Sequence, residues 1–135
     1  MTGAPPTEYK ISSEGDIVTA RKLVREVANA LGFGLTDVTR IVTAASELTR
    51  NIYVHAGSGI MRCGPARLQT KVGIEIVFED RGPGIADINQ AMEPGFSTGK
   101  SMGMGLPGSK RLMDELAITS VVGKGTTVIV RKWLR

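Results

Sequence analysis

The feature that most constrains the fold is a glycine-rich stretch at residues 93–108, EPGFSTGKSMGMGLPG. It contains G-x-x-x-G-K-S, one residue shorter than a P-loop, followed by G-x-G-x-x-G, the dinucleotide fingerprint. A P-loop must follow a buried strand, whereas this stretch follows AMEP. A dinucleotide fold needs a βαβ unit and an acidic residue about 20 positions later, but the residues after Gly108 end in what resembles an antiparallel hairpin. No H-R-D or D-F-G follows, which excludes a protein-kinase glycine loop. These three phosphate-binding folds are therefore excluded.

Two interpretations of the stretch remain. Glycines let a backbone approach a phosphate closely, and a helix N-terminus offers unpaired N–H groups to an anion. Pro107 suits the first turn of a helix, because the N–H that it lacks would have no helical partner there. The alternative is a plain glycine connector between two helices. The stretch alone does not separate the two.

Hydrophobic periodicity predicts the elements around this stretch. In chain order we expect a short strand at YKIS, a helix over 16–31, a helix over 37–55 capped by Thr36, an edge strand within 57–65, a strand over 72–80, a short helix within 85–92, a helix from the glycines to about Glu115, and two strands, LAITSVV and TTVIVRKW, joined by a GKG hairpin.

This order predicts an α/β chain, in detail an α+β two-layer sandwich, with a mixed, mostly antiparallel sheet and helices on one face. Residues 1–8 are expected to be a flexible tail, and residues 9–135 one domain. No apolar run approaches the ~20 residues of a membrane span. Cys63 is the only cysteine, so a reducing cytoplasm is expected, and Cys63 itself is predicted to be a small buried hydrophobe.

Charge and composition allow a nucleic-acid binder but do not favour one. The net charge is +4 and the sequence pI is about 9.5. However, only 4% of the residues are aromatic and none alternates with basic residues as a stacking platform requires. His55 is the only histidine, which argues against histidine-cluster metal sites and Ser-His-Asp chemistry. An anionic ligand or an acidic partner explains the scattered basic residues more simply.

A polar pair on the second predicted helix forms one candidate site. Glu47 and Asn51 are four residues apart, so both lie on one helix face, and His55 continues their line. They flank the apolar stripe of Ile41, Ala44, Ala45, Leu48 and Ile52. The Asn51 side-chain oxygen suits magnesium, and the Glu47 carboxylate can accept a proton. For the pair alone, an ordinary polar helix edge is the favoured interpretation.

A carboxylate at the end of a predicted strand forms a second candidate site. Asp80 ends the strand, and Gly82 and Gly84 follow in EDRGPGIAD. Glycines that keep a space open would let Asp80 accept a hydrogen bond from an exocyclic amino group. The alternative is a plain strand-to-loop turn.

The motifs ELTRN, DRGPGI, GMGLPG and GKGTT, in this order and spacing, resemble the GHKL, or Bergerat-type, ATP-binding fold. Within that superfamily, SELTRNIYVHAG, EDRGPGI, GFST, GLPGSKRLMDE and the terminal KWLR resemble the bacterial serine/threonine kinases that regulate sigma factors by partner switching, in particular the stressosome switch kinases. The resemblance covers nearly the whole chain.

The resemblance implies a role for each matching residue. Glu47 would be the general base, Asn51 would hold Mg²⁺ that bridges the ATP phosphates, and Asp80 would bond the adenine amino group. Residues 96–102 would form the ATP lid. The implied nucleotide-binding residues are Asn51, Asp80, Gly82, Gly84, Ile85, Thr98, Lys100, Gly103, Met104, Gly105, Leu106 and Thr126.

The function that the resemblance implies is an ATP-dependent and Mg²⁺-dependent serine/threonine protein kinase. It would phosphorylate STAS-domain scaffold and antagonist proteins of a stressosome and, once released, bind and activate a PP2C-type phosphatase or another downstream regulator. We expect a monomer when free, without nucleic-acid or membrane partners. The alternatives are an anti-sigma-factor serine kinase of the dimeric kind, a non-catalytic ATP-binding partner-switch module, and a DNA-binding protein. A detached histidine-kinase domain is disfavoured.

Overall fold

The computed structural model describes residues 6–92 and 105–135. The helices and strands in chain order are β1 (Thr7–Ile11), α1 (Gly15–Leu31), α2 (Leu35–Ala56), β2 (Gly59–Leu68), β3 (Lys71–Asp80), α3 (Ile88–Ala91), α4 (Gly105–Leu112), β4 (Glu115–Val121) and β5 (Gly125–Trp133). This order confirms the predicted succession of elements.

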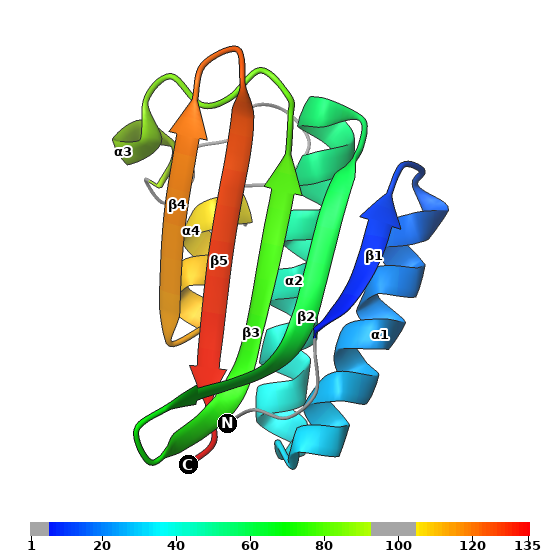
Figure 1. Cartoon of the computed structure of the whole chain (residues 1–135), viewed down its shortest axis with the longest axis vertical. Helices are drawn as coiled ribbons and strands as arrows, with labels where there is room; N and C mark the ends of the chain where they lie inside the picture. The colour runs from blue at the N-terminus through cyan, green and yellow to red at the C-terminus, as the bar shows by residue number, and fades with distance from the viewer. Residues whose placement is uncertain (1–5, 93–104) are drawn as a thin grey trace.

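The five strands form one sheet in the order β1-β2-β3-β5-β4, with α1, α2 and α4 behind one face (Figure 1). The α+β two-layer class is therefore confirmed. The expectation of a mixed sheet is wrong, because all four neighbouring pairs of the described sheet are antiparallel. The strands β3 and β4 run in the same direction, but β5 lies between them, so no parallel pair forms.

The boundaries of α2 and β2 differ from the expectation. Gly34, not Thr36, is the N-cap of α2, because the backbone N–H of Val38 donates to the Gly34 carbonyl at 2.9 Å. Thr36 instead lies in the first turn of the helix. The strand β2 is longer than predicted and lies between β1 and β3, so it is not an edge strand.

Two further boundaries are corrected at the ends of elements. The strand β1 begins at Thr7, inside the segment that was expected to be a tail. The helix α4 ends at Leu112 rather than near Glu115. Glu115 already belongs to β4, where it pairs with Arg131, and the N–H of Asp114 donates to the Arg131 carbonyl.

The hydrophobic core fills the space between the helices and the sheet. All five residues of the predicted α2 stripe are buried. They lie in one cluster with the inward-facing strand residues Ile74, Ile76, Phe78, Val128 and Val130. Cys63 belongs to the same cluster, and burial raises the pKa of its thiol to about 12. The prediction that Cys63 is a buried hydrophobe is thus confirmed.

Candidate functional site

A cavity of about 360 Å³ opens where the end of α2, the end of β3, the loop after β3 and the start of α4 meet. Seven of the residues implied by the resemblance line it: Asn51, Asp80, Gly84, Ile85, Gly105, Leu106 and Thr126. Four others, Thr98, Lys100, Gly103 and Met104, lie outside the described residues, as does the expected lid. Two described residues, Glu47 and Gly82, do not line the cavity itself.

The helix α2 contributes one wall. Leu48, Asn51, Ile52 and His55 line the cavity, because residues three and four positions apart share one face of a helix. The apolar members continue the buried stripe, and Asn51 brings a carboxamide to its edge.

Glu47 lies one turn before Asn51 on α2 and is half-buried. Its Oε1 atom is buried and has no hydrogen-bond partner among the residues that the structure describes. A buried carboxylate oxygen without a partner has lost its water without compensation, which is costly. A surface ion pair would have satisfied it, so the alternative of Glu47 as an ordinary exposed helix edge is not supported. The atom is available to a proton or to a ligand.

Asp80 is the last residue of β3, and its carboxylate is held by the loop that follows. The backbone N–H of Gly82 donates to Asp80 Oδ1 at 2.8 Å, which fixes the carboxylate orientation. A Cβ atom at Gly82 would lie only 2.6 Å from the Ala56 Cβ, so only glycine fits. Gly82, which the resemblance implies as a nucleotide-binding residue, therefore holds the Asp80 carboxylate and does not line the cavity itself.

The loop after Gly82 is tied to the β4–β5 hairpin. The N–H of Ile85 donates to Ser120 Oγ at 2.7 Å, and the N–H of Gly123 donates to the Pro83 carbonyl at 2.8 Å. Gly84 has a φ of +78°, and a Cβ atom there would collide with the Val121 carbonyl. These contacts give the cavity a shaped wall of backbone.

The N-terminus of α4 forms another wall. Gly105, Leu106 and Pro107 all line the cavity and are buried. The first N–H groups of a helix have no partner within the helix and carry the positive end of its dipole. This wall is therefore suited to the negative charge of a phosphate.

Some lining residues had no assigned role in the sequence analysis. Asp87, Gln90 and Ala91 come from the short helix α3 and its N-cap. Asp87 Oδ1 accepts the N–H of Gln90 at 3.0 Å, an N-cap pattern that the sequence D-I-N-Q carries but that alone does not indicate a ligand site. Ser120 lies behind the cavity wall. The sequence alone does not indicate this position, which follows from the pairing of Ser120 with Thr126 across the β4–β5 hairpin.

The described residues contain no group of three or more His, Cys, Asp or Glu side chains that could hold a metal ion. Within the same part of the chain, no helix is long and apolar enough to cross a membrane.

Three comparisons place the chain among known proteins. Residues 12–132 match the family described as "Histidine kinase-like ATPase domain". The chain is 53% identical over 126 residues to the serine/threonine-protein kinase RsbT of Bacillus subtilis (strain 168), which covers 93% of this chain and 95% of that protein. It is 36% identical over 121 residues to the anti-sigma F factor of Caldanaerobacter subterraneus subsp. tengcongensis, which covers 85% of this chain and 83% of that protein.

Solved structures show the same fold. The crystal structure of the RsbU and RsbW domains of Rv1364c from Mycobacterium tuberculosis matches 98% of this chain with a TM-score of 0.65 and 20% identity. The match spans 33% of that longer chain. The mycobacterial sensor histidine kinase MprB matches 94% of this chain and 97% of its own, with a TM-score of 0.58 and 17% identity.

Proposed function

Since the chain belongs to the family of histidine kinase-like ATPase domains, we propose that it is an ATP-dependent serine/threonine protein kinase that acts as a partner-switching regulator. One observation carries this proposal: a single cavity gathers Asn51, Asp80, Thr126 and the N-terminus of α4, one helical turn from the unpaired carboxylate oxygen of Glu47. The 53% identity to a serine/threonine-protein kinase, over nearly the whole of both chains, supports the same activity.

The residues present fit ATP. Ile52, Phe78, Leu106 and Val128 offer apolar surface to a flat base. Asp80, held by the Gly82 N–H, offers an acceptor for the adenine amino group. The N-terminus of α4 offers N–H groups for the phosphates. The implied binding residues 98, 100, 103 and 104 lie outside the described residues.

Magnesium would arrive with ATP. Asn51 offers a single neutral oxygen, and Mg²⁺ commonly keeps several waters and takes its remaining ligands from substrate phosphates. When bound, the ion neutralises charge on the phosphates. The role of Glu47 is to accept the proton of the incoming serine or threonine hydroxyl, and the unpaired Oε1 atom supports this role.

The finer proposal concerns partners. The substrates are STAS-domain scaffold and antagonist proteins of a stressosome-like complex in the cytoplasm, and the released kinase, a monomer, activates a PP2C-type phosphatase or another downstream regulator. The similarity to the kinase RsbT supports it. The second candidate is an anti-sigma-factor serine kinase, which the 36% identity to an anti-sigma F factor favours.

The test uses two variants and two readouts. Asp80→Asn keeps the shape but loses a charge-assisted hydrogen bond, so calorimetry should show ATP binding weaker by ~1.5–3 kcal/mol. Glu47→Ala should keep ATP affinity and lose roughly 10²–10⁴-fold in single-turnover transfer from radiolabelled ATP to a purified STAS-domain protein. Asn51→Ala should lose both ATP affinity and phosphate transfer. Glu26→Ala, an exposed position on α1, is the matched control.

Each outcome has a distinct meaning. Unchanged ATP affinity in Asp80→Asn would contradict the adenine assignment. Transfer at the wild-type rate by Glu47→Ala would contradict the general-base role. ATP binding without transfer by the wild-type protein, to STAS-domain and anti-sigma partners alike, would favour the non-catalytic module.

A further inference from the structure

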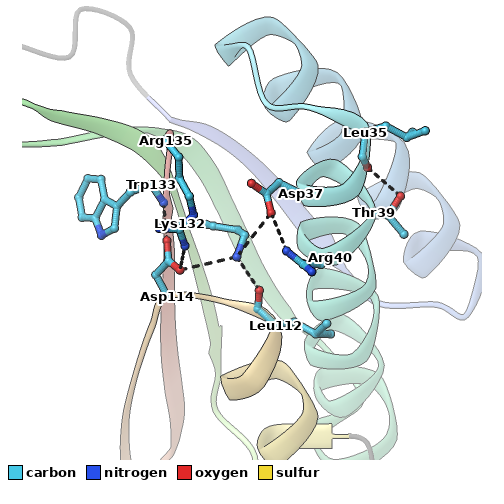
Figure 2. A network of polar contacts seen from close by, with 9 residues as sticks. All are labelled: Leu35, Asp37, Thr39, Arg40, Leu112, Asp114, Lys132, Trp133 and Arg135. Atoms are coloured by element: carbon cyan, nitrogen blue, oxygen red, sulfur yellow. Dashed lines mark hydrogen bonds and ion pairs between the residues drawn. The ribbon is translucent and has the colours of Figure 1, made fainter.

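Three elements that line the cavity are joined at their far ends by one buried side chain. Asn51 near the end of α2, Thr126 near the start of β5 and Gly105 at the start of α4 line the cavity. Lys132 lies at the opposite end of β5 and is only 4% exposed. Its ammonium group reaches both α2 and α4 (Figure 2). The cavity and the contacts of Lys132 are therefore at opposite ends of the same three elements.

The main contact of Lys132 has a fixed direction. Its Nζ atom donates to the carbonyl of Leu112, the last residue of α4, at 2.9 Å. An ammonium group can only donate and a carbonyl can only accept, so the two roles are not interchangeable. Nζ also lies 3.9 Å from Oδ1 of Asp37, in the first turn of α2, and 3.7 Å from Oδ1 of Asp114. One cation thus joins the far end of α4 to the start of α2.

The helix α4 depends on tertiary contacts for its position. Its described part is short and contains Gly105 and Gly108, and glycine has a low helix propensity. The last carbonyls of a helix have no partner within the helix, and the carbonyl of Leu112 obtains one from Lys132. A short helix of this composition is stabilised by packing and by contacts of this kind rather than by its own hydrogen bonds.

A small tilt of α4 would matter most at the cavity. From Leu112 to Gly105 the helix spans about 10 Å, so a tilt of about 10° around the Leu112 end would move the first turn by about 2 Å. A hydrogen bond does not survive such a shift, because its donor–acceptor distance stays near about 2.9 Å. Apolar contacts with a flat base tolerate the shift better, since the hydrophobic effect has no directional requirement.

We infer that Lys132 is a positioning residue for the phosphate-binding wall. By holding the far end of α4, it keeps the N–H groups of the first turn of α4 directed at the phosphates of the nucleotide. This inference rests on the proposed ATP-binding function. Lys132 does not line the cavity, so it acts through α4 and not by contact with ATP. In the proposed complex the base lies mainly against α2, β3 and β5, so the loss of Lys132 should weaken phosphate binding more than base binding.

Two ligands separate these effects. ATP with magnesium reports the base and the phosphates together, whereas adenosine reports the base without the phosphates. Calorimetry gives the dissociation constant of ATP directly and that of adenosine in competition with ATP. The preference, defined as the ratio of the two constants, would be measured in the wild type, Lys132→Met and Asp37→Asn.

The matched control is Ala28→Gly. Ala28 is buried on α1, a helix that does not line the cavity. Glycine in a helix interior destabilises the helix through its low propensity. This variant therefore lowers the stability of the protein without removing a contact of Lys132.

The wild type should prefer ATP over adenosine by at least about tenfold, the effect of one hydrogen bond to a charged group. In Lys132→Met this preference should fall by about threefold to tenfold, because the first turn of α4 is no longer held in place. Asp37→Asn keeps the hydrogen bond to Leu112 and loses only the charge on α2, so the preference should fall by about twofold. Ala28→Gly should leave the preference unchanged.

The preference remains interpretable in a partly unfolded variant, because both ligands are measured against the same folded fraction. Equal losses of ATP and adenosine affinity in Lys132→Met would overturn the inference and leave Lys132 as a purely structural residue. If Lys132→Met does not fold, an unchanged preference in Asp37→Asn would overturn it instead. A wild type that binds ATP and adenosine equally tightly would also overturn it, because α4 would then hold no phosphate. A wild type that binds neither ligand would refute the proposed ATP-binding function.

Discussion

At the scale of single residues, Asp16 shows how one side chain joins two elements. Its Oδ2 atom accepts the backbone N–H groups of Ser12 and Ser13 at 2.8 and 3.0 Å, just before α1 begins. Its Oδ1 atom accepts the Tyr9 hydroxyl of β1 at 2.8 Å. These hydrogen bonds stabilise the charged carboxylate and lower the pKa of Asp16 to about 2. The Ser12 N–H makes the largest contribution, and the Tyr9 hydroxyl makes the second largest. The carboxylate therefore links β1 to the start of α1.

The first prediction concerns the pH dependence of Asp16→Asn. The Asp16 pKa is about 2 in the folded protein, against an ordinary value of 3.8. A depressed folded pKa contributes stability that is present above the ordinary value and is lost as pH falls through the folded value. The variant should therefore melt below the wild type at pH 7, and the gap should narrow between about pH 4 and pH 2.

The measurement is thermal unfolding followed by circular dichroism from pH 7 to pH 2. Glu14→Gln, an exposed neighbour, is the control. A gap in Tm between Asp16→Asn and the wild type that stays constant over this whole range would show that the Asp16 charge does not carry the effect.

At the scale of elements, α4 is a short helix held at its far end. Its described part has 8 residues, and isolated helices shorter than about 12 residues are marginal in water. The buried Lys132 of β5 donates from Nζ to the carbonyl of Leu112, the last residue of α4, at 2.9 Å (Figure 2). Lys132 Nζ also lies 3.9 Å from Oδ1 of Asp37 on α2 and 3.7 Å from Oδ1 of Asp114. One end of α4 thus lines the cavity while the other is anchored to α2 and β5.

Asp114 is the acidic centre of this anchor. Burial alone would raise its pKa, but the Trp133 N–H, Lys132 and Arg135 together outweigh burial and hold the pKa below its ordinary value. The backbone N–H of Trp133 donates to Asp114 Oδ2 at 2.8 Å, and Arg135 Nη2 lies 2.7 Å from Asp114 Oδ1.

The second prediction is the effect of Lys132→Met. The substitution keeps most of the length of the side chain but leaves the partly buried Leu112 carbonyl without its donor. It should lower the free energy of unfolding by about 1–3 kcal/mol, the cost of an acceptor left unsatisfied. The carboxylates of Asp37 and Asp114 should add little to this cost, because they retain Arg40 and Arg135 as partners. Urea denaturation measures the cost. Hydrogen exchange should show the α4 amides less protected relative to those of α1.

The control for this prediction is Lys22→Met on the exposed face of α1. Surface substitutions of this kind usually change stability by no more than about 0.5 kcal/mol. An equal effect of Lys132→Met and Lys22→Met would show that the anchor does not hold α4.

At the scale of the whole molecule, the cavity joins parts that are far apart in sequence. Its wall combines α2, the end of β3, α3, the start of α4 and β5. A ligand that contacts all of these elements binds the folded chain and not the unfolded one. Binding should therefore stabilise the fold as a unit rather than one element of it.

The third prediction follows from this linkage. ATP with magnesium, at a free concentration 100 times its Kd, should stabilise the protein by about 2.7 kcal/mol, which raises Tm by several degrees. Magnesium chloride alone should leave Tm unchanged, because we expect the ion to take its ligands from phosphates, water and Asn51 together. Differential scanning fluorimetry measures both shifts. A Tm rise with magnesium alone would point to a protein-only metal site.

Much of the architecture was predictable from local sequence patterns. The helices α1 and α2, the strand that ends at Asp80 and the hairpin at Gly123–Gly125 follow from side-chain periodicity and turn residues, which depend on neighbours a few positions away. The motifs also predicted several residues that the structure brings into one cavity, Asn51, Asp80 and Thr126 among them. Their binding roles remain proposals.

The tertiary structure decided what depends on distant neighbours. The interior position of β2 required β1 as its partner, and the antiparallel sheet required β5 to separate β3 from β4. Gly82 matters because Ala56 of α2 is close to it, and Ser120 matters because Thr126 and Ile85 both reach its hydroxyl. Periodicity reports only whether a side chain is buried. Which groups share a hydrogen bond is set by strand order and register, which arise when segments far apart in the chain come together.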